Sequence, residues 1–101
     1  MEKFSKETKA GVLQGSYDAK FKPVVDAFVE NFEKHDEVGA NVAITLEGKT
    51  VVDLWGGRKA RDGEPWEKDT VSIVFSCTKG ATSLCAPMLA DRGTLDLDAK
   101  V

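Results

Sequence analysis

Apolar residues recur with helical spacing between positions 23 and 35. They are Val24, Val25, Phe28, Val29 and Phe32. This spacing places one apolar stripe along a helix, where it can pack against a core. Pro23 suits a first helical turn because its missing N–H costs no hydrogen bond there. Lys34 and His35 suit the negative end of the helix dipole. The pattern therefore predicts an amphipathic helix over residues 23–35.

Beyond Gly39 the pattern changes to two β-branched runs, within the stretch ANVAITLEGKTVVDLWGG. The runs flank Glu47-Gly48-Lys49, and a short glycine-containing turn between such runs is typical of an antiparallel hairpin. Residues 60–70 contain glycine, proline and many charged side chains, which predicts a loop. Residues 1–19 are polar and show no clear periodicity, so we expect an extended lead-in. The expected sheet therefore has only two strands.

A second helix is predicted from Ser76 to Asp91, directly after the apolar run 71–75. Its expected buried face consists of Ala81, Leu84, Cys85, Met88 and Leu89. Gly93 provides its C-terminal stop. Pro87 should kink the helix or mark tight packing against another element. The chain is thus predicted to be α+β, and we expect it to be incomplete, because a lone hairpin with half-covered helices is marginally stable.

Composition narrows the classes of function. The chain has 101 residues, 42% hydrophobic and 31% charged, as in a soluble globular domain. The net charge of −3 and the scattered lysines and arginines exclude a nucleic-acid partner. The sequence has neither a run of about 20 apolar residues nor a secretory signal, so we expect no membrane association and a cytoplasmic location. Cys77 and Cys85 lie about 12 Å apart along the predicted helix, too far to form a disulfide.

Ser76-Cys77-Thr78-Lys79 is an S-x-x-K sequence at a predicted helix start. Residues three apart on a helix share one face, with Cβ atoms about 5–6 Å apart, so the Lys79 amine can reach the Ser76 hydroxyl. The positive end of the helix dipole favours an alkoxide at Ser76, and the backbone N–H there can donate to an oxyanion. A buried, neutral lysine can take the serine proton. On the tetrapeptide alone, however, a helix-capping serine followed by an exposed lysine is the better explanation of the pattern, because capping is the commonest role of such a serine.

The surrounding sequence favours the catalytic interpretation. VFSCTKG, followed by an apolar helix and LADRGTLDLDAKV, resembles the serine β-lactamase, penicillin-binding-protein and family VIII carboxylesterase superfamily. The W-G-G turn and the P-W-x-x-D-T approach resemble its esterase-like branch. The likeness runs from about residue 20 to residue 101, and Lys100 stands where this branch often has proline. The resemblance implies the N-terminal part of a β-lactamase/transpeptidase-like fold, with residues 20–101 forming an incomplete hydrolase domain.

The same resemblance implies a mechanism. Ser76 would be the acyl-enzyme nucleophile and Lys79 its proton partner, acting on a small-molecule ester or amide, with small acyl esters favoured. Such enzymes also carry a downstream Tyr in a Y-x-N-like motif and a K-T-G-like strand. The single tyrosine here, Tyr17, does not match, and Lys49-Thr50 is followed by Val51 instead of glycine. We therefore expect the chain alone to be inactive unless a companion chain supplies these elements.

Two alternatives remain open. The chain can be a non-catalytic, truncated family member that acts as a binding or scaffold module, or its parent can be a β-lactamase or D-amino-acid peptidase instead of an esterase. No metal or cofactor is implied, because Asp91, Asp96 and Asp98 lack the glycine and the final glutamate of a calcium loop. His35 is better explained as a helix-end residue than as part of a Ser-His-Asp triad. Trp55 and Trp66 are expected to pack the hairpin and the loop.

Overall fold

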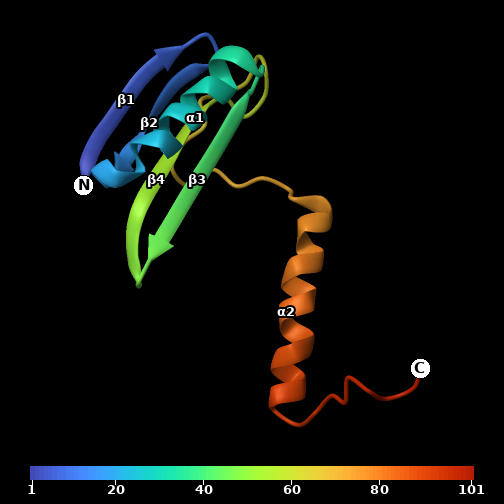
Figure 1. Cartoon of the computed structure of the whole chain (residues 1–101). Helices are drawn as coiled ribbons and strands as arrows, with labels where there is room; N and C mark the ends of the chain where they lie inside the picture. The colour runs from blue at the N-terminus through green and yellow to red at the C-terminus, as the bar shows by residue number, and fades with distance from the viewer. The chain divides into compact units, whose positions relative to one another are not determined.

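The computed structural model describes all residues from 1 to 101. The chain divides into two compact units, unit 1 (Met1–Thr70) and unit 2 (Val71–Val101), which are described separately. The elements of unit 1 are β1 (Glu2–Thr8), β2 (Gly11–Tyr17), the 3-10 helix η1 (Ala19–Phe21), α1 (Lys22–Lys34), β3 (Gly39–Leu46) and β4 (Lys49–Gly57) (Figure 1). Unit 2 contains the 3-10 helix η2 (Phe75–Cys77) and α2 (Thr78–Asp91). The fold class is α+β, as predicted.

The predicted hairpin is confirmed as β3 and β4, which pair in an antiparallel register from Gly39↔Gly57 to Leu46↔Lys49. Its turn is formed by Glu47 and Gly48, whose φ angles are +51° and +75°. Positive φ at both central positions is the geometry that matches the twist of a two-residue hairpin. Glu47-Gly48 therefore closes the hairpin where the sequence pattern places it.

The sheet has four strands, in the order β1-β2-β4-β3, and the expectation of a two-stranded sheet is wrong. The residues expected to form an extended lead-in contain β1 and β2, and β2 pairs with β4 from Leu13↔Gly56 to Tyr17↔Val52. The reason lies in the composition of β1 and β2. Few of their residues are large and apolar, and Phe4, Leu13 and Tyr17 fall too far apart in sequence to give a clear alternation.

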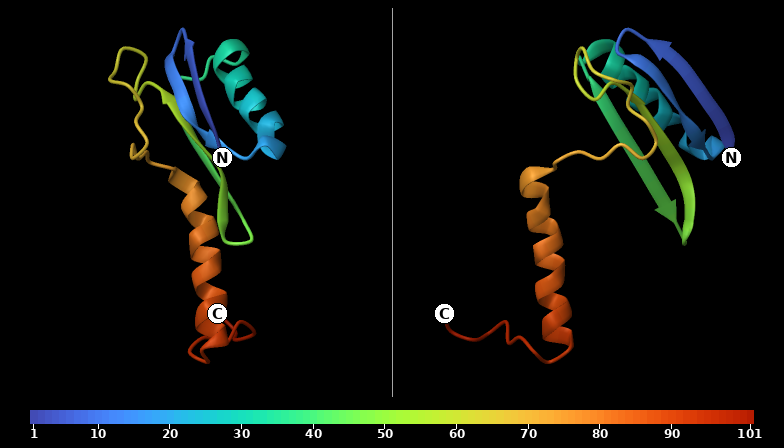
Figure 2. Two further views of the ribbon diagram at one scale, coloured as in Figure 1. Left: turned by 90° about the vertical axis from the view of Figure 1, so that its left-hand side faces the viewer. Right: turned by 180° about the vertical axis from the view of Figure 1, so that it is seen from behind.

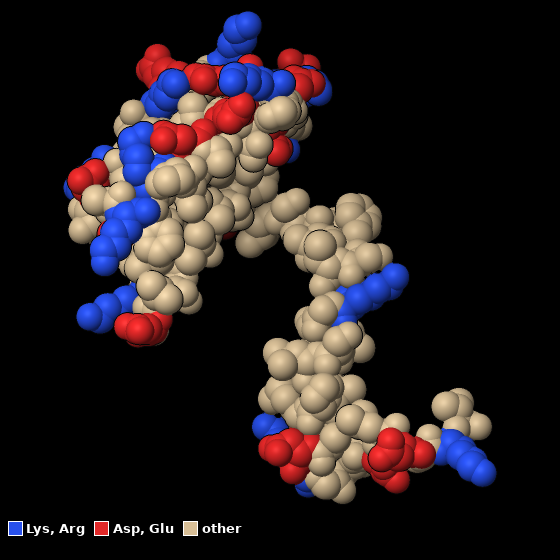
Figure 3. Space-filling view, viewed as in Figure 1, with Lys and Arg blue, Asp and Glu red and all other residues tan.

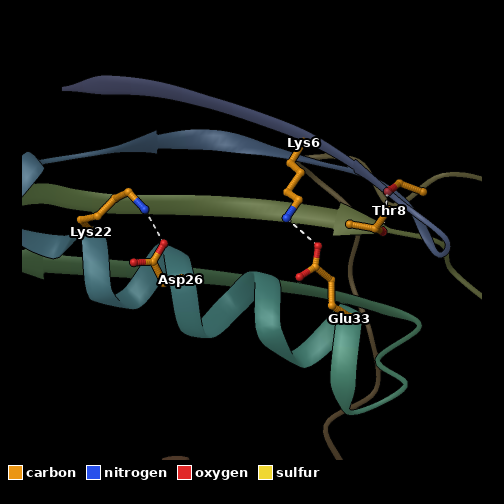
Figure 4. Close-up of polar contacts among 6 residues, drawn as sticks. Lys6, Thr8, Lys22, Asp26 and Glu33 are labelled. Carbon is orange, nitrogen blue, oxygen red and sulfur yellow. Dashed lines mark hydrogen bonds and ion pairs between the residues drawn. The ribbon is translucent and has the colours of Figure 1, made fainter.

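Helix α1 covers one face of this sheet (Figure 2). The buried core consists of Leu13, Tyr17, Val25, Phe28, Phe32, Val52 and Leu54. The rings of Phe28 and Phe32 lie one helical turn apart, with centroids separated by 5.3 Å. Burial of each large side chain stabilises the fold by roughly 1.5–3 kcal/mol. An ion pair between Lys6 on β1 and Glu33 on α1 joins helix and sheet at the rim (Figure 4). The helix predicted at 23–35 is thus confirmed, with its apolar stripe inward.

Segment 58–70 lies across the other face of the sheet (Figure 2). The backbone N–H of Trp66 donates to the Gly57 carbonyl at 2.8 Å, and that of Arg58 donates to the Val38 carbonyl at 2.7 Å. The Trp66 ring packs so closely on Gly39 that a Cβ there would lie 2.6 Å from its Cε3 atom. This contact confirms the expected packing role of Trp66 and explains why residue 39 is glycine.

Unit 2 is a helix with a well-defined end and no core. The Gly93 N–H donates to the Ala90 carbonyl and the Thr94 N–H to the Leu89 carbonyl, both at 3.0 Å, while Gly93 has a φ of +77°. This is the double hydrogen bond of a Schellman motif, and it confirms Gly93 as the helix stop. Helix α2 continues past Pro87 to Asp91.

The predicted buried face of α2 is not formed within these residues. No residue of α2 is buried, and Leu84 is 64% exposed. The apolar spacing was identified correctly, but nothing within unit 2 covers it. Neither helix α1 nor helix α2 combines the length and the hydrophobicity needed to cross a membrane.

Candidate active site

Ser76 lies in the short helix η2 and Lys79 in the first turn of α2, so one helical run carries both residues. Helix α2 begins at Thr78, two residues later than predicted, because the run opens with a tighter 3-10 turn. The Thr78 N–H donates to the carbonyl of Phe75, which joins η2 to α2. The i, i+3 relation of the two residues is kept, and both side chains therefore project from neighbouring positions on one side of the run.

The residue directly before the nucleophile candidate has an unusual backbone. Phe75 has a φ of +46°, in the left-handed region. For a bulky residue without a glycine's freedom, this conformation is an outlier that costs about 1–3 kcal/mol. Strained residues of this kind cluster at active sites and ligand-binding sites. This feature could not be predicted from the residue type, since phenylalanine does not favour positive φ.

The start of the helical run also sets the electrostatics at Ser76. The first N–H groups of a helix have no partner within it and, with the helix dipole, create a partial positive charge. Ser76 lies within this first turn. Its backbone N–H is thus suited to donate to an oxyanion, and its hydroxyl lies where negative charge is favoured.

Other groups that this chemistry needs are not gathered around Ser76 within unit 2. Both Ser76 and Lys79 are exposed. The side-chain hydrogen bond of this turn runs from Thr82 Oγ1 to the Thr78 carbonyl oxygen, at 3.2 Å, and involves neither residue. Tyr17 belongs to the buried core of unit 1, where its hydrogen bond to Glu2 raises the pKa of the phenol. Tyr17 is thus accounted for as a core residue of unit 1.

The other residues that the sequence offered as possible catalytic or metal-binding groups have structural roles or are exposed. His35 is the C-terminal cap of α1, and its backbone N–H donates to the Asn31 carbonyl at 3.1 Å. Asp96 accepts the backbone N–H of Asp98 at 2.9 Å, which confirms a turn. Cys77 and Cys85 are exposed free thiols. No group of three or more His, Cys, Asp or Glu side chains is arranged to hold a metal ion.

Comparison with known proteins places these residues in a family. A family model described as Beta-lactamase matches residues 22–101. The esterase/beta-lactamase LipL of Mycobacterium tuberculosis is 42% identical over 88 residues, which cover 86% of this chain and 20% of LipL. The crystal structure of a family VIII carboxylesterase matches with a TM-score of 0.76 and 42% identity, over 86% of this chain and 24% of that chain.

The chain therefore belongs to the β-lactamase family, the superfamily of serine β-lactamase-like esterases and β-lactamases, and it corresponds to the N-terminal part of that fold. It spans about a fifth of the length of LipL and about a quarter of the matching carboxylesterase chain. The family match begins at residue 22 and contains α1, the β3–β4 hairpin and the Ser76–Lys79 run. Strands β1 and β2 lie outside the part that the family model matches.

Proposed function

We propose that this chain carries the nucleophile of a serine hydrolase that acts on carboxylic esters of small acyl groups. Ser76 is the nucleophile and Lys79 its proton partner. One observation carries the proposal: Ser76 and Lys79 stand three residues apart at the start of a helical run, directly after the strained Phe75, within the segment that matches the β-lactamase family. The esterase branch is favoured because a family VIII carboxylesterase is among the matching structures.

The proposed reaction has two steps. The neutral amine of Lys79 takes the Ser76 hydroxyl proton while Oγ bonds to the ester carbonyl carbon, and the resulting oxyanion accepts a hydrogen bond from the Ser76 N–H. Collapse breaks the bond between the carbonyl carbon and the alkoxide oxygen, and the alkoxide takes the proton from the Lys79 ammonium and leaves as an alcohol. A water molecule then attacks the acyl carbon while the Lys79 amine takes a proton from it. The bond from the acyl carbon to Ser76 Oγ breaks, Oγ receives that proton from Lys79, and the carboxylic acid leaves. No metal or cofactor takes part in these steps.

The exposure of Lys79 bears on the activity of the chain by itself. A lysine accepts a proton only when its amine is neutral, and burial favours the neutral form. Unit 2 contains no surface that buries Lys79. The 101 residues alone are therefore expected to be a poor catalyst. A companion polypeptide with the Tyr and K-T-G-like elements would cover the lysine and add the second oxyanion donor.

Intact-protein mass spectrometry after incubation with a fluorophosphonate tests the proposal. The chain is labelled alone and together with a polypeptide that supplies the remaining family elements, beside Ser76→Ala and Lys79→Ala. A single adduct that is lost in both variants supports Ser76 as the nucleophile and Lys79 as its proton partner. If this adduct forms only when the second polypeptide is present, the chain alone lacks part of the active site. An adduct on the chain alone overturns the expected inactivity.

Retention of the adduct in Ser76→Ala would remove Ser76 as the nucleophile. Absence of any adduct in the complemented sample would favour the alternative of a non-catalytic binding module. Hydrolysis of a penicillin-type amide in preference to a short-chain ester would move the parent from the esterase to the β-lactamase branch. Ser83 is exposed like Ser76 but lies in the interior of α2. It is a matched control, because Ser83→Ala leaves the proposed pair intact.

A further inference from the structure

A groove crosses the outer face of the sheet, on the side away from α1. Its volume is about 470 Å³, within the range of small-molecule sites. The polar, charged and aromatic side chains that line it are Lys3, Ser5, Gln14, Ser16, Asp53, Trp55 and Lys68. All of them belong to unit 1, so the groove is complete within that unit.

The strand register explains why these side chains meet. Ser5 pairs with Gln14, and Gln14 pairs with Trp55, so a hydroxyl, an amide and an indole form one row across β1, β2 and β4. Lys3 pairs with Ser16 and Ser16 with Asp53 in the next row along. Paired residues on one face have Cβ atoms about 4.5–5.5 Å apart, so the two rows form a continuous polar surface beside an aromatic ring.

The charged groups at the groove are not balanced. Lys68 lies over the Trp55 ring, 5.8 Å from its centroid, and 3.6 Å from the Asp53 carboxylate. That ion pair is long and exposed, so it holds Lys68 only weakly. Lys3 lies at the opposite side and makes no ion pair in this structure. Two ammonium groups against one carboxylate leave the groove with one positive charge in excess.

The groove also stands apart from the family's reaction. Lys3, Ser5, Gln14 and Ser16 precede residue 22, where the family match begins. Two thirds of the lining residues of the groove therefore come from the β1–β2 hairpin, outside the segment that the family model matches.

We propose that the groove binds a saccharide that carries one carboxylate, as a uronic acid does. The apolar face of a sugar ring packs on Trp55. Its hydroxyl groups exchange hydrogen bonds with Ser5, Gln14 and Ser16. Its carboxylate lies between the ammonium groups of Lys3 and Lys68, where charge-assisted hydrogen bonds are strongest.

Nuclear magnetic resonance of the ¹⁵N-labelled chain, titrated with D-glucuronate, tests this site. The two tryptophans give two indole N–H signals. The Trp66 indole nitrogen is buried and serves as an internal reference, since it does not line this groove. Saturable movement of the Trp55 signal, with a Kd of about 1 mM for a ligand of this size, and a still Trp66 signal are expected.

D-glucose and acetate separate the two halves of the proposed ligand. Glucose should bind at least severalfold more weakly, and acetate should produce no saturable shift. Lys3→Ala should weaken glucuronate binding severalfold, while Lys20→Ala, at an exposed lysine outside the groove, should leave it unchanged. Trp55→Phe, followed by the backbone signals of Gln14 and Ser16, should also weaken it. No saturable shift with glucuronate, or equal shifts with acetate, would overturn the proposal.

Discussion

The two units of the chain differ in what holds them together. Unit 1 encloses seven buried residues between α1 and the four-stranded sheet. Unit 2 buries no side chain, and its large apolar residues are exposed; they include Ile73, Phe75, Leu84 and Leu97. The C-terminus of α2 is nevertheless well defined, because the backbone N–H groups of Gly93 and Thr94 donate to the last carbonyls of the helix. Local signals therefore specify a helix in both units, but only unit 1 supplies the surface that buries one.

This difference bears directly on the proposed active site, because Ser76 and Lys79 lie in the unit without a core. Charged residues of both signs gather at the upper end and along the left-hand side of unit 1 in Figure 3. The exposed apolar side chains of α2, namely Leu84, Met88 and Leu89, have the spacing of a helix that packs on a hydrophobic surface. A nucleophile on such a helix gains its fixed orientation when that surface is present. The following predictions test how far the two units differ.

The largest expected difference is in amide hydrogen exchange. The amides of β2 and β4, in the centre of the sheet, should exchange at least about a thousandfold more slowly than those of α2, since their opening requires loss of the core. A 14-residue helix that is not packed against anything is marginally stable in water. Exchange followed by mass spectrometry of peptides from the intact chain measures both. Equal protection of α2 and β4 would mean that α2 is covered in solution.

A pair of leucine substitutions measures the same contrast in free energy. Leu54 is fully buried, and Leu54→Ala should lower the free energy of unfolding by about 2–5 kcal/mol. Leu84→Ala removes the same atoms from an exposed position and should change it by less than about 0.5 kcal/mol. Urea denaturation followed by circular dichroism provides both values. A comparable loss for Leu84→Ala, dependent on protein concentration, would reveal self-association through α2.

Substitution of two glycines by alanine should have smaller effects, which destabilise unit 1 and stabilise the helix of unit 2. Gly57 has a φ of +83°, and a Cβ there would lie 2.2 Å from the Val38 carbonyl oxygen. Gly57→Ala should destabilise unit 1 by about 1–2 kcal/mol from the backbone alone. Gly80 in α2 has open space around it, so Gly80→Ala should favour the helix by roughly 0.5–1 kcal/mol. The thermal midpoint of unfolding measures the effect of Gly57→Ala, and the far-ultraviolet circular dichroism of the helix measures the effect of Gly80→Ala.

The sequence predicted those elements whose signals are local. The apolar stripe of α1, the Glu47-Gly48 turn and the Gly93 helix stop each depend on a few neighbouring residues, and the structure contains all three. Strands β1 and β2 were missed as strands because their place in the sheet depends on pairing with β4, some 40 residues away in sequence. Pairing between distant strands leaves no periodic trace when few of the paired residues are apolar.

The parts of the candidate site that depend on neighbouring residues were also predictable from the sequence. The spacing of Ser76 and Lys79 and the glycine that ends their helix can be recognised in the sequence. The positive φ of Phe75 cannot, because it is imposed by the way the chain enters η2 and not by the residue type. The burial expected for the apolar face of α2 was wrong for this chain, since periodicity identifies a face but not the surface that covers it.

The smallest expected effect concerns an ion pair at the edge of unit 1. Arg61 Nη2 lies 2.7 Å from Asp36 Oδ2, and a second hydrogen bond of 3.3 Å joins Nη1 to Oδ1, which connects the loop after β4 to the end of α1. Hydrogen bonding and the charge of Arg61 hold the pKa of Asp36 below its ordinary value of 3.8. Because the folded state favours the ionised carboxylate, the pair stabilises unit 1 above about pH 4. This contribution is lost as the pH falls through the lowered pKa.

Asp36→Asn should therefore lower the thermal midpoint slightly at pH 7, and the difference from the unchanged chain should vanish in acid. Arg61→Gln should have the same effect, and the double variant should be no worse than either single one, as expected for two residues that act through one contact. Added salt should reduce the difference, since both side chains are exposed. Asp62→Asn, at a neighbouring exposed carboxylate without an ion pair, is the control. A difference that persists at pH 2 would show that Asp36 acts through packing, and the protection of α2 should change in none of these variants.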